Sequence, residues 1–98
     1  MENILAYPNP ASGNQPLSIR FETRFTPSGG KIAVFTAALR KIREFDIGPD
    51  LQKGINIYEL EEASIFGLAN GTYYYIMILW DKEGRPVKSK AEKFIKIR

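Results

Sequence analysis

Residues 17–25 read Leu-Ser-Ile-Arg-Phe-Glu-Thr-Arg-Phe, so that Leu, Ile, Phe and Thr alternate strictly with charged or polar residues. Successive side chains of a strand point to opposite faces, and this period of two therefore predicts a strand with one buried and one solvated face. A turn-forming cluster, Thr-Pro-Ser-Gly-Gly, occupies residues 26–30, and a second alternating run begins at Lys31. This stretch therefore predicts two strands joined by a turn, with the second running back beside the first.

The same kind of pattern continues along the chain. Further strands are expected around residues 42–47, 55–59, 72–80 and 87–97. The first of these is less regular and is expected to be bulged or at an edge. The run at 72–80 is apolar on both faces, which is typical of a central strand. The opening Tyr7-Pro8-Asn9-Pro10 is expected to be an edge strand that leaves into a turn, because proline cannot donate to a sheet.

Strands at this spacing, with turns between them and no convincing long helix, predict the fold class. We expect an all-β protein, an immunoglobulin-like antiparallel β-sandwich of about seven strands. Residues 60–69 are expected to be a crossover loop. At 98 residues the chain has the size of one domain, so residues 1–98 are expected to form one core.

Composition excludes several functions. The chain has no cysteine and no histidine, so it cannot build a Cys-based zinc site or a His-dependent triad. A small sandwich also offers little cleft for catalysis, and we expect a protein that is not an enzyme and has no cofactor or metal. The net charge of +3 is spread along the chain, which argues against nucleic-acid binding. No apolar run is long enough to insert into a membrane.

Two sets of side chains each allow two interpretations. Tyr73, Tyr75 and Met77 are candidates for a ligand platform, but their alternation is also that of core residues on a strand, which we favour. Trp80 and Tyr58 are candidates for stacking on sugar rings, as in a carbohydrate-binding module, although a lone Trp at a strand end more often covers the edge of a core.

Four landmarks together resemble a known pattern. They are Tyr7-Pro8-Asn9-Pro10, the run from Lys31 to Phe35 with Arg40 and Ile42 beyond it, Asn70-Gly71-Thr72-Tyr73-Tyr74-Tyr75, and the closing Lys93-Phe-Ile-Lys-Ile-Arg98. In this order and spacing the chain resembles the flagellar hook-capping-type Ig-like domain and the related C-terminal sorting domain of type IX secretion. Thr36 and Leu39 stand where that family has Asp and Gly, which predicts a differently shaped or longer connection there.

The resemblance implies a non-catalytic accessory domain of a bacterial secreted or cell-surface protein. The domain would be the C-terminal module of a larger exported protein, with its signal peptide outside this chain, and would lie outside the cell or in the cell envelope. It would act as a spacer or assembly module, or as a secretion-sorting domain. Its partners would be the secretion machinery or neighbouring domains of the parent chain.

The C-terminal strand is where these roles would diverge. Its basic residues alternate with apolar ones and are either a solvated strand face or the surface that a protein partner recognises. The candidates for partner recognition are Lys90, Lys93, Lys96 and Arg98. We expect Phe94, Ile95 and Ile97 to close the sandwich. The alternative function is carbohydrate binding, with Trp80 and Tyr58 as the stacking residues and a polysaccharide as the partner.

Overall fold

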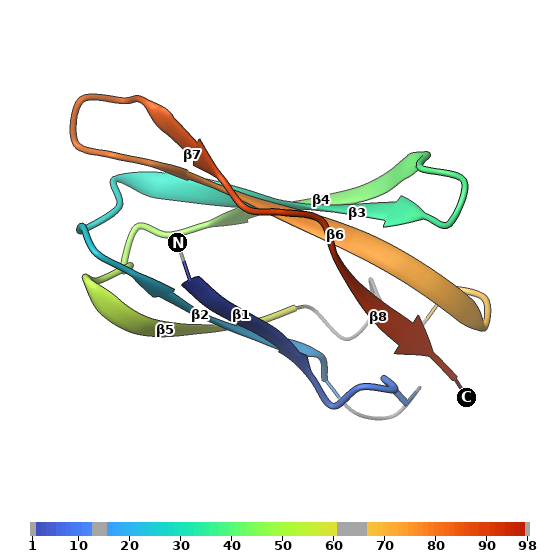
Figure 1. Cartoon of the computed structure of the whole chain (residues 1–98). Coiled ribbons are helices and arrows are strands. Elements are labelled where there is room, and N and C mark those ends of the chain that lie inside the picture. Colours follow the sequence, from blue (N-terminus) through green and yellow to red (C-terminus); the bar gives the residue numbers. More distant parts are fainter. Residues whose placement is uncertain (1, 13–15, 61–66, 98) are drawn as a thin grey trace.

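The structure is a computed structural model that describes residues 2–12, 16–60 and 67–97 (Figure 1). These described residues form eight strands and no helix. The strands are β1 (Glu2–Tyr7), β2 (Ser18–Thr23), β3 (Gly29–Thr36), β4 (Lys41–Ile47), β5 (Gly54–Glu59), β6 (Gly71–Trp80), β7 (Pro86–Lys88) and β8 (Glu92–Lys96).

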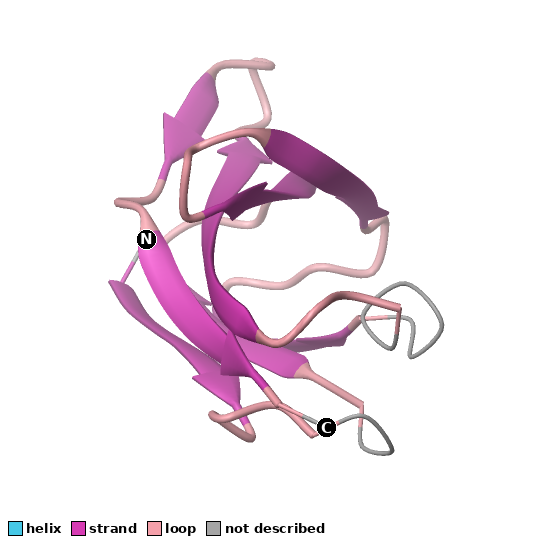
Figure 2. Cartoon of the chain, turned by 90° about the vertical axis from the view of Figure 1, so that its right-hand side faces the viewer, coloured by secondary structure: helices cyan, strands magenta, loops and turns pink. Residues whose placement is uncertain are grey.

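The strands pair into two antiparallel sheets. One has the order β1-β2-β5. The other has the order β4-β3-β6, and both β7 and β8 pair with the same edge of β6. The ten residues of β6 give room for both, since β7 lies beside residues 78–80 and β8 beside residues 71–75. Figure 2 shows the two sheets from the side, facing one another as the layers of a sandwich.

Ser89 closes the gap between β7 and β8. Its backbone N–H donates to the Met77 carbonyl at 2.8 Å, and its Oγ accepts the Met77 N–H at 2.9 Å. A single hydroxyl residue thus continues the hydrogen bonding of β6 where neither short strand reaches it.

The core lies between the two inner faces and is closed by aromatic side chains. On β6 every second residue from Tyr73 to Leu79 is buried. Phe94 of β8 lies between two of them, with its ring centroid 5.5 Å from that of Tyr73 and 6.3 Å from that of Tyr75. The prediction that Tyr73, Tyr75 and Met77 are core residues is confirmed.

The fold class is confirmed: the chain is an all-β, Ig-like antiparallel β-sandwich. The opening strand β1 is an edge strand and ends at Tyr7, immediately before Pro8. The less regular run forms β4, which is also an edge strand, and its pairing with β3 shifts register between Val34 and Phe35. Most of the predicted crossover loop, residues 61–66, lies outside the described residues.

The turn from β3 to β4 is tight even though glycine is missing from it. The Leu39 N–H donates to the Thr36 carbonyl at 2.8 Å, and the Thr36 N–H donates to the Arg40 carbonyl at 2.9 Å. Leu39 has a φ of 66°, in the left-handed region that glycine occupies without strain and that other residues enter at a cost of about 1–2 kcal/mol. Leu39 thus adopts the left-handed conformation that glycine favours, and a short turn joins the two strands.

The C-terminal strand corrects one prediction. Phe94 is fully buried, but Ile95 and Ile97 are exposed, and Lys96 is the buried residue, with 3% of its surface accessible. The reason is the period of two, which places Lys96 on the same inner face as Phe94. Residue Ala11 runs beside this strand and covers its free edge: it donates to the Ile95 carbonyl at 2.6 Å and accepts from the Ile97 N–H at 2.8 Å.

Candidate functional site

The most distinctive solvent-facing feature of the larger sheet is a line of apolar side chains along β6. Because the odd-numbered residues of this strand point into the core, the even-numbered ones point outward. Four of them are large, apolar and half-buried, and we call them the outer row: Tyr74, Ile76, Ile78 and Trp80. No described element packs over this face (Figures 1 and 2), so the outer row meets solvent.

The neighbouring strand β3 widens the outer row. Phe35 lies opposite Tyr74, Ala33 opposite Ile76 and Lys31 opposite Ile78. Phe35 is also half-buried. The apolar surface is therefore two strands wide at the Tyr74 end and narrows to one strand at Ile78, where a lysine replaces the apolar neighbour.

The border of this surface towards β4 carries charged side chains that pair with one another. Lys31 of β3 and Lys41 of β4 provide the positive charges, and Glu44 and Asp46 of β4 provide the negative ones. The Lys31 Nζ lies 3.1 Å from Glu44 Oε1 and 3.7 Å from Asp46 Oδ1, and the Lys41 Nζ lies 3.0 Å from Glu44 Oε2. Hydrogen bonds from Lys41 and Lys31 lower the pKa of Glu44, and the same contact with Glu44 raises the pKa of Lys31. This border therefore presents two bases and two acids that already satisfy one another.

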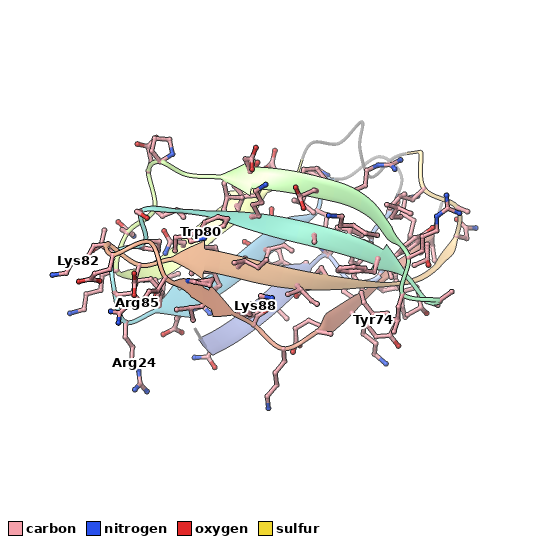
Figure 3. The ribbon with its side chains drawn as sticks, turned by 90° about the horizontal axis from the view of Figure 1, so that it is seen from above. Arg24, Tyr74, Trp80, Lys82, Arg85 and Lys88 are labelled. Carbon is pink, nitrogen blue, oxygen red and sulfur yellow. The ribbon has the colours of Figure 1, made fainter. Side chains whose placement is uncertain are left out.

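The opposite border, on β7 and β8, carries two lysines without an acidic partner among the described residues. Lys88 lies opposite Ile78, and Lys93 lies opposite Tyr74. Neither lysine makes an ion pair with any residue that the structure describes. Figure 3 looks onto this face, with Trp80 and Tyr74 towards opposite ends of β6 and Lys88 between them. The outer row thus has a neutral border on one side and a positive border on the other.

Beyond Trp80 the chain enters a turn that Asp81 holds together. The Asp81 Oδ1 accepts the backbone N–H groups of Glu83 and Arg85, each at 2.9 Å, and its Oδ2 accepts the Arg85 Nε at 3.1 Å. These contacts, of which the hydrogen bond from the Arg85 backbone is the strongest, lower the pKa of Asp81. The Arg85 guanidinium is therefore paired with Asp81 within the turn. Lys82 extends from the tip of the turn (Figure 3).

The four predicted recognition residues do not share one surface. Lys90 is exposed between β7 and β8, and Lys93 belongs to the basic border. Lys96 is buried, and its Nζ donates to the Ile97 carbonyl at 3.0 Å, so this residue cannot meet a partner in the folded domain. Arg98 lies outside the described residues. Of the predicted residues that the structure describes, Lys93 lies on the border of the outer row, and Lys88, which was not predicted, lies there with it.

The predicted sugar-stacking pair is also separated. Trp80 is on the outer face of the larger sheet, whereas Tyr58 is on the inner face of β5, beside Asn56, and packs against the core. The Tyr58 hydroxyl donates to the Asp46 carbonyl at 3.4 Å. The two rings belong to different sheets and different faces, so they form no common platform.

The sequence signal for the outer row is that residues 72–80 are apolar on both faces. That pattern predicts a central strand but does not assign its outward residues, apart from Trp80, to a binding surface. A sandwich has two layers, however, and each sheet has an uncovered face. In such a fold an apolar outward row on the central strand marks a surface that is available to a partner.

The described residues hold no cluster of three or more acidic side chains that could bind a metal ion. Within the same residues no helix combines the length and the apolar character needed to span a membrane.

Comparison with known proteins gives a likeness in fold. No family model matches the chain, and no curated protein matches it. The crystal structure of CopC from Methylosinus trichosporium OB3b is similar in fold, with a TM-score of 0.58 and 17% sequence identity, over 95% of this chain and 90% of that one. At this identity the likeness shows the fold.

CopC is a copper-binding periplasmic protein. The predicted role as a non-catalytic spacer or sorting domain is therefore contradicted, because the similar structure points away from it. Copper binding cannot be inferred for this chain from the likeness to CopC. The chain has no histidine or cysteine, and Met77, the methionine among the described residues, is fully buried in the core, so the described residues offer copper no imidazole or soft ligand at their surface.

Proposed function

We propose that the protein is an extracytoplasmic binding domain that holds a segment of a partner protein on the outer row. The observation that carries the proposal is the uncovered line of four large apolar side chains along β6, bordered on one side by two lysines that lack ion pairs. The periplasmic location of CopC supports a place outside the cytoplasm.

The chemistry of the surface defines the partner. Trp80 and Tyr74 offer large rigid contact areas of the kind that dominates binding energy at protein interfaces. Ile76 and Ile78 lie between them and exclude water from the centre of the surface. A partner that covers this row brings apolar side chains against it, and it gains most when carboxylates lie beside Lys88 and Lys93. The proposed partner is therefore an acidic segment with interspersed apolar residues.

The lysines of the positive border can contribute both charge and apolar contact. The aliphatic stem of a lysine can lie along apolar surface while its ammonium group stays in water. Lys88 and Lys93 flank the two ends of the outer row and can therefore extend the apolar contact while selecting for negative charge. The β4 border adds no comparable preference, because its lysines already pair with Glu44 and Asp46.

Trp80 makes the proposal directly testable. It is the single tryptophan of the chain and lies on the proposed surface, so its fluorescence reports contact there. The protein is titrated with a synthetic peptide of alternating Leu and Glu and, in parallel, with one of alternating Leu and Lys. We expect a saturable change in emission with the acidic peptide, weakened by added salt. No change with either peptide, or the same change with both, contradicts the proposal.

A matched pair of charge variants then locates the positive border. The double variant Lys88→Gln/Lys93→Gln should weaken binding of the acidic peptide by about three- to tenfold, because an exposed charge pair contributes up to about 1 kcal/mol. Arg24→Gln removes an exposed positive charge immediately after β2, in the other sheet, and should leave the affinity unchanged. Equal weakening by both variants would show a general effect of net charge instead of a site.

A further inference from the structure

The sandwich has two edge strands on one side, β4 in the larger sheet and β5 in the smaller one. They are close enough for the Tyr58 hydroxyl of β5 to reach the Asp46 carbonyl of β4. Unpaired edges invite pairing with another chain, and charged residues are a common protection. β4 has this protection, because Lys41, Glu44 and Asp46 form an ion-pair network with Lys31 along it.

The edge strand β5 lacks such protection. Its outward-facing residues include Ile55 and Ile57, which are 47% and 60% exposed. Charge occurs only at the two ends of the strand, at Lys53 and Glu59, and neither forms an ion pair with a described residue. A short apolar edge with opposite charges at its ends is suited to antiparallel pairing with an identical strand.

The backbone groups of β5 that do not pair with β2 lie at these residues. The Leu60 N–H donates to the Leu17 carbonyl at 2.8 Å, and from this bond the antiparallel ladder alternates through Tyr58 and Asn56. The backbone groups of Ile55, Ile57 and Glu59 therefore point away from β2. In agreement, the Gln52 side-chain amide donates to the Ile55 carbonyl from outside the sheet, at 2.9 Å. Pairing with another strand therefore requires this oxygen to accept a second hydrogen bond or to exchange Gln52 for the incoming N–H.

We propose that β5 pairs antiparallel with β5 of a second copy of this chain, about a twofold axis at Asn56. In this register Ile55 lies opposite Ile57 of the second copy, and Lys53 lies level with Glu59 of the second copy. Each contact occurs twice because the axis repeats it. All four isoleucines fall on one face, and both ion pairs join opposite charges. The charge pattern of the strand thus selects a second copy as the occupant of this edge.

The pairing joins the two smaller sheets into one six-stranded sheet. The twofold axis is perpendicular to that sheet, so the outer faces of both larger sheets point to the same side of the dimer. This inference does not depend on the proposed function. If both hold, the dimer presents two outer rows to one partner surface, and the second binding event becomes intramolecular.

The oligomeric state of the full chain tests the pairing. Sedimentation equilibrium up to about 1 mM protein detects even a weak dimer. Ile57→Pro removes an outward N–H but keeps the bonds to β2, which come from Asn56 and Tyr58, and proline is tolerated on such an edge. We expect the wild type to dimerise and Ile57→Pro to raise the dimer dissociation constant at least about tenfold.

Leu5→Lys is the matched control. Leu5 is 55% exposed on the same outer face of the same sheet, but it belongs to the far edge strand β1. Edge pairing leaves this variant dimeric, with a dissociation constant within about twofold of the wild type. A wild type that is monomeric up to about 1 mM, or a Leu5→Lys variant as weak as Ile57→Pro, overturns the proposal.

A charge exchange tests the register. Lys53→Glu or Glu59→Lys alone places like charges opposite one another twice in the dimer and should weaken it about tenfold. The double variant Lys53→Glu/Glu59→Lys restores opposite charges and should return the dissociation constant to within about threefold of the wild type. A double variant weaker than either single variant overturns this pairing. Circular dichroism of each variant verifies that the monomer is folded.

Discussion

The two faces of β6 have almost the same chemistry and opposite surroundings. Its inward residues are buried, namely Tyr73, Tyr75, Met77 and Leu79. Its outward residues are only half-buried, namely Tyr74, Ile76, Ile78 and Trp80. Both rows carry tyrosine and long aliphatic side chains. The inner row is explained by folding, because it fills the core. The outer row fills no core, and its large apolar side chains on an uncovered sheet face are the basis of the proposed role in binding.

The largest expected difference between the two rows is in stability. Tyr75→Ala should lower the free energy of unfolding by about 3–5 kcal/mol, because Tyr75 is fully buried and packs against Phe94. Tyr74→Ala removes the same side chain from the outward face and should cost at most about 1 kcal/mol. Urea denaturation measures both. Similar losses for the two variants would mean that the faces do not differ in burial.

The pH dependence of stability should also separate the rows. Burial, and secondarily the Glu92 carboxylate, raises the pKa of Tyr75 to about 12, whereas tyrosine in an unfolded chain has a pKa of about 10. Between these values the unfolded chain loses the tyrosine proton while the folded chain keeps it. The contribution of protonated Tyr75 to the free energy of unfolding is therefore fully present below about pH 10 and is lost as the pH rises towards 12.

The loss should reach about 2 kcal/mol at pH 12. Tyr75→Phe cannot ionise, so its stability should fall less steeply between pH 9 and pH 12, by about this amount. Urea denaturation of the two proteins across this interval measures the difference, and parallel curves would contradict the assigned pKa.

Two adjacent glycines give a smaller version of the same comparison. A Cβ at Gly30 would lie 2.7 Å from the Ile78 carbonyl oxygen and 2.8 Å from Leu79 Cδ2, whereas a Cβ at Gly29 meets nothing within 4 Å. Gly30→Ala should therefore cost about 1–3 kcal/mol, because the tightly packed inner side must shift. Gly29→Ala should change the free energy of unfolding by at most about 0.5 kcal/mol. A neutral Gly30→Ala would show that the inner face tolerates extra volume.

Much of the fold could be predicted from the alternation in the sequence. The pattern at residues 17–25 corresponds to β2, and the irregular run before Gly48 corresponds to the edge strand β4. The C-terminal strand could not be assigned in the same way, because Phe94, Ile95 and Ile97 do not obey one period of two. The structure resolves this conflict by burying Lys96 together with Phe94 and covering the strand with Ala11.

The candidate site was less predictable than the fold. Trp80 and Lys93 were identified, but each was assigned to a surface with residues that the sandwich places elsewhere. The reason is physical: the positions of Tyr58 and Lys88 relative to β6 depend on which strands become neighbours, and strand order is set by long-range pairing. The sequence pattern reports the face of a side chain within its own strand only.

The most direct test of the outer row combines affinity and stability in one variant. Ile78→Ser shortens a half-buried side chain between Lys31 and Lys88 and keeps Trp80 as the fluorescent reporter. We expect its dissociation constant for the alternating Leu and Glu peptide to rise at least about tenfold, because about 1.4 kcal/mol of apolar contact is lost, while its melting temperature changes little. Leu5→Ser, on the outer face of the other sheet, is the control and should bind as the wild type does. Wild-type affinity in a folded Ile78→Ser protein would contradict the assignment of the outer row as the binding surface.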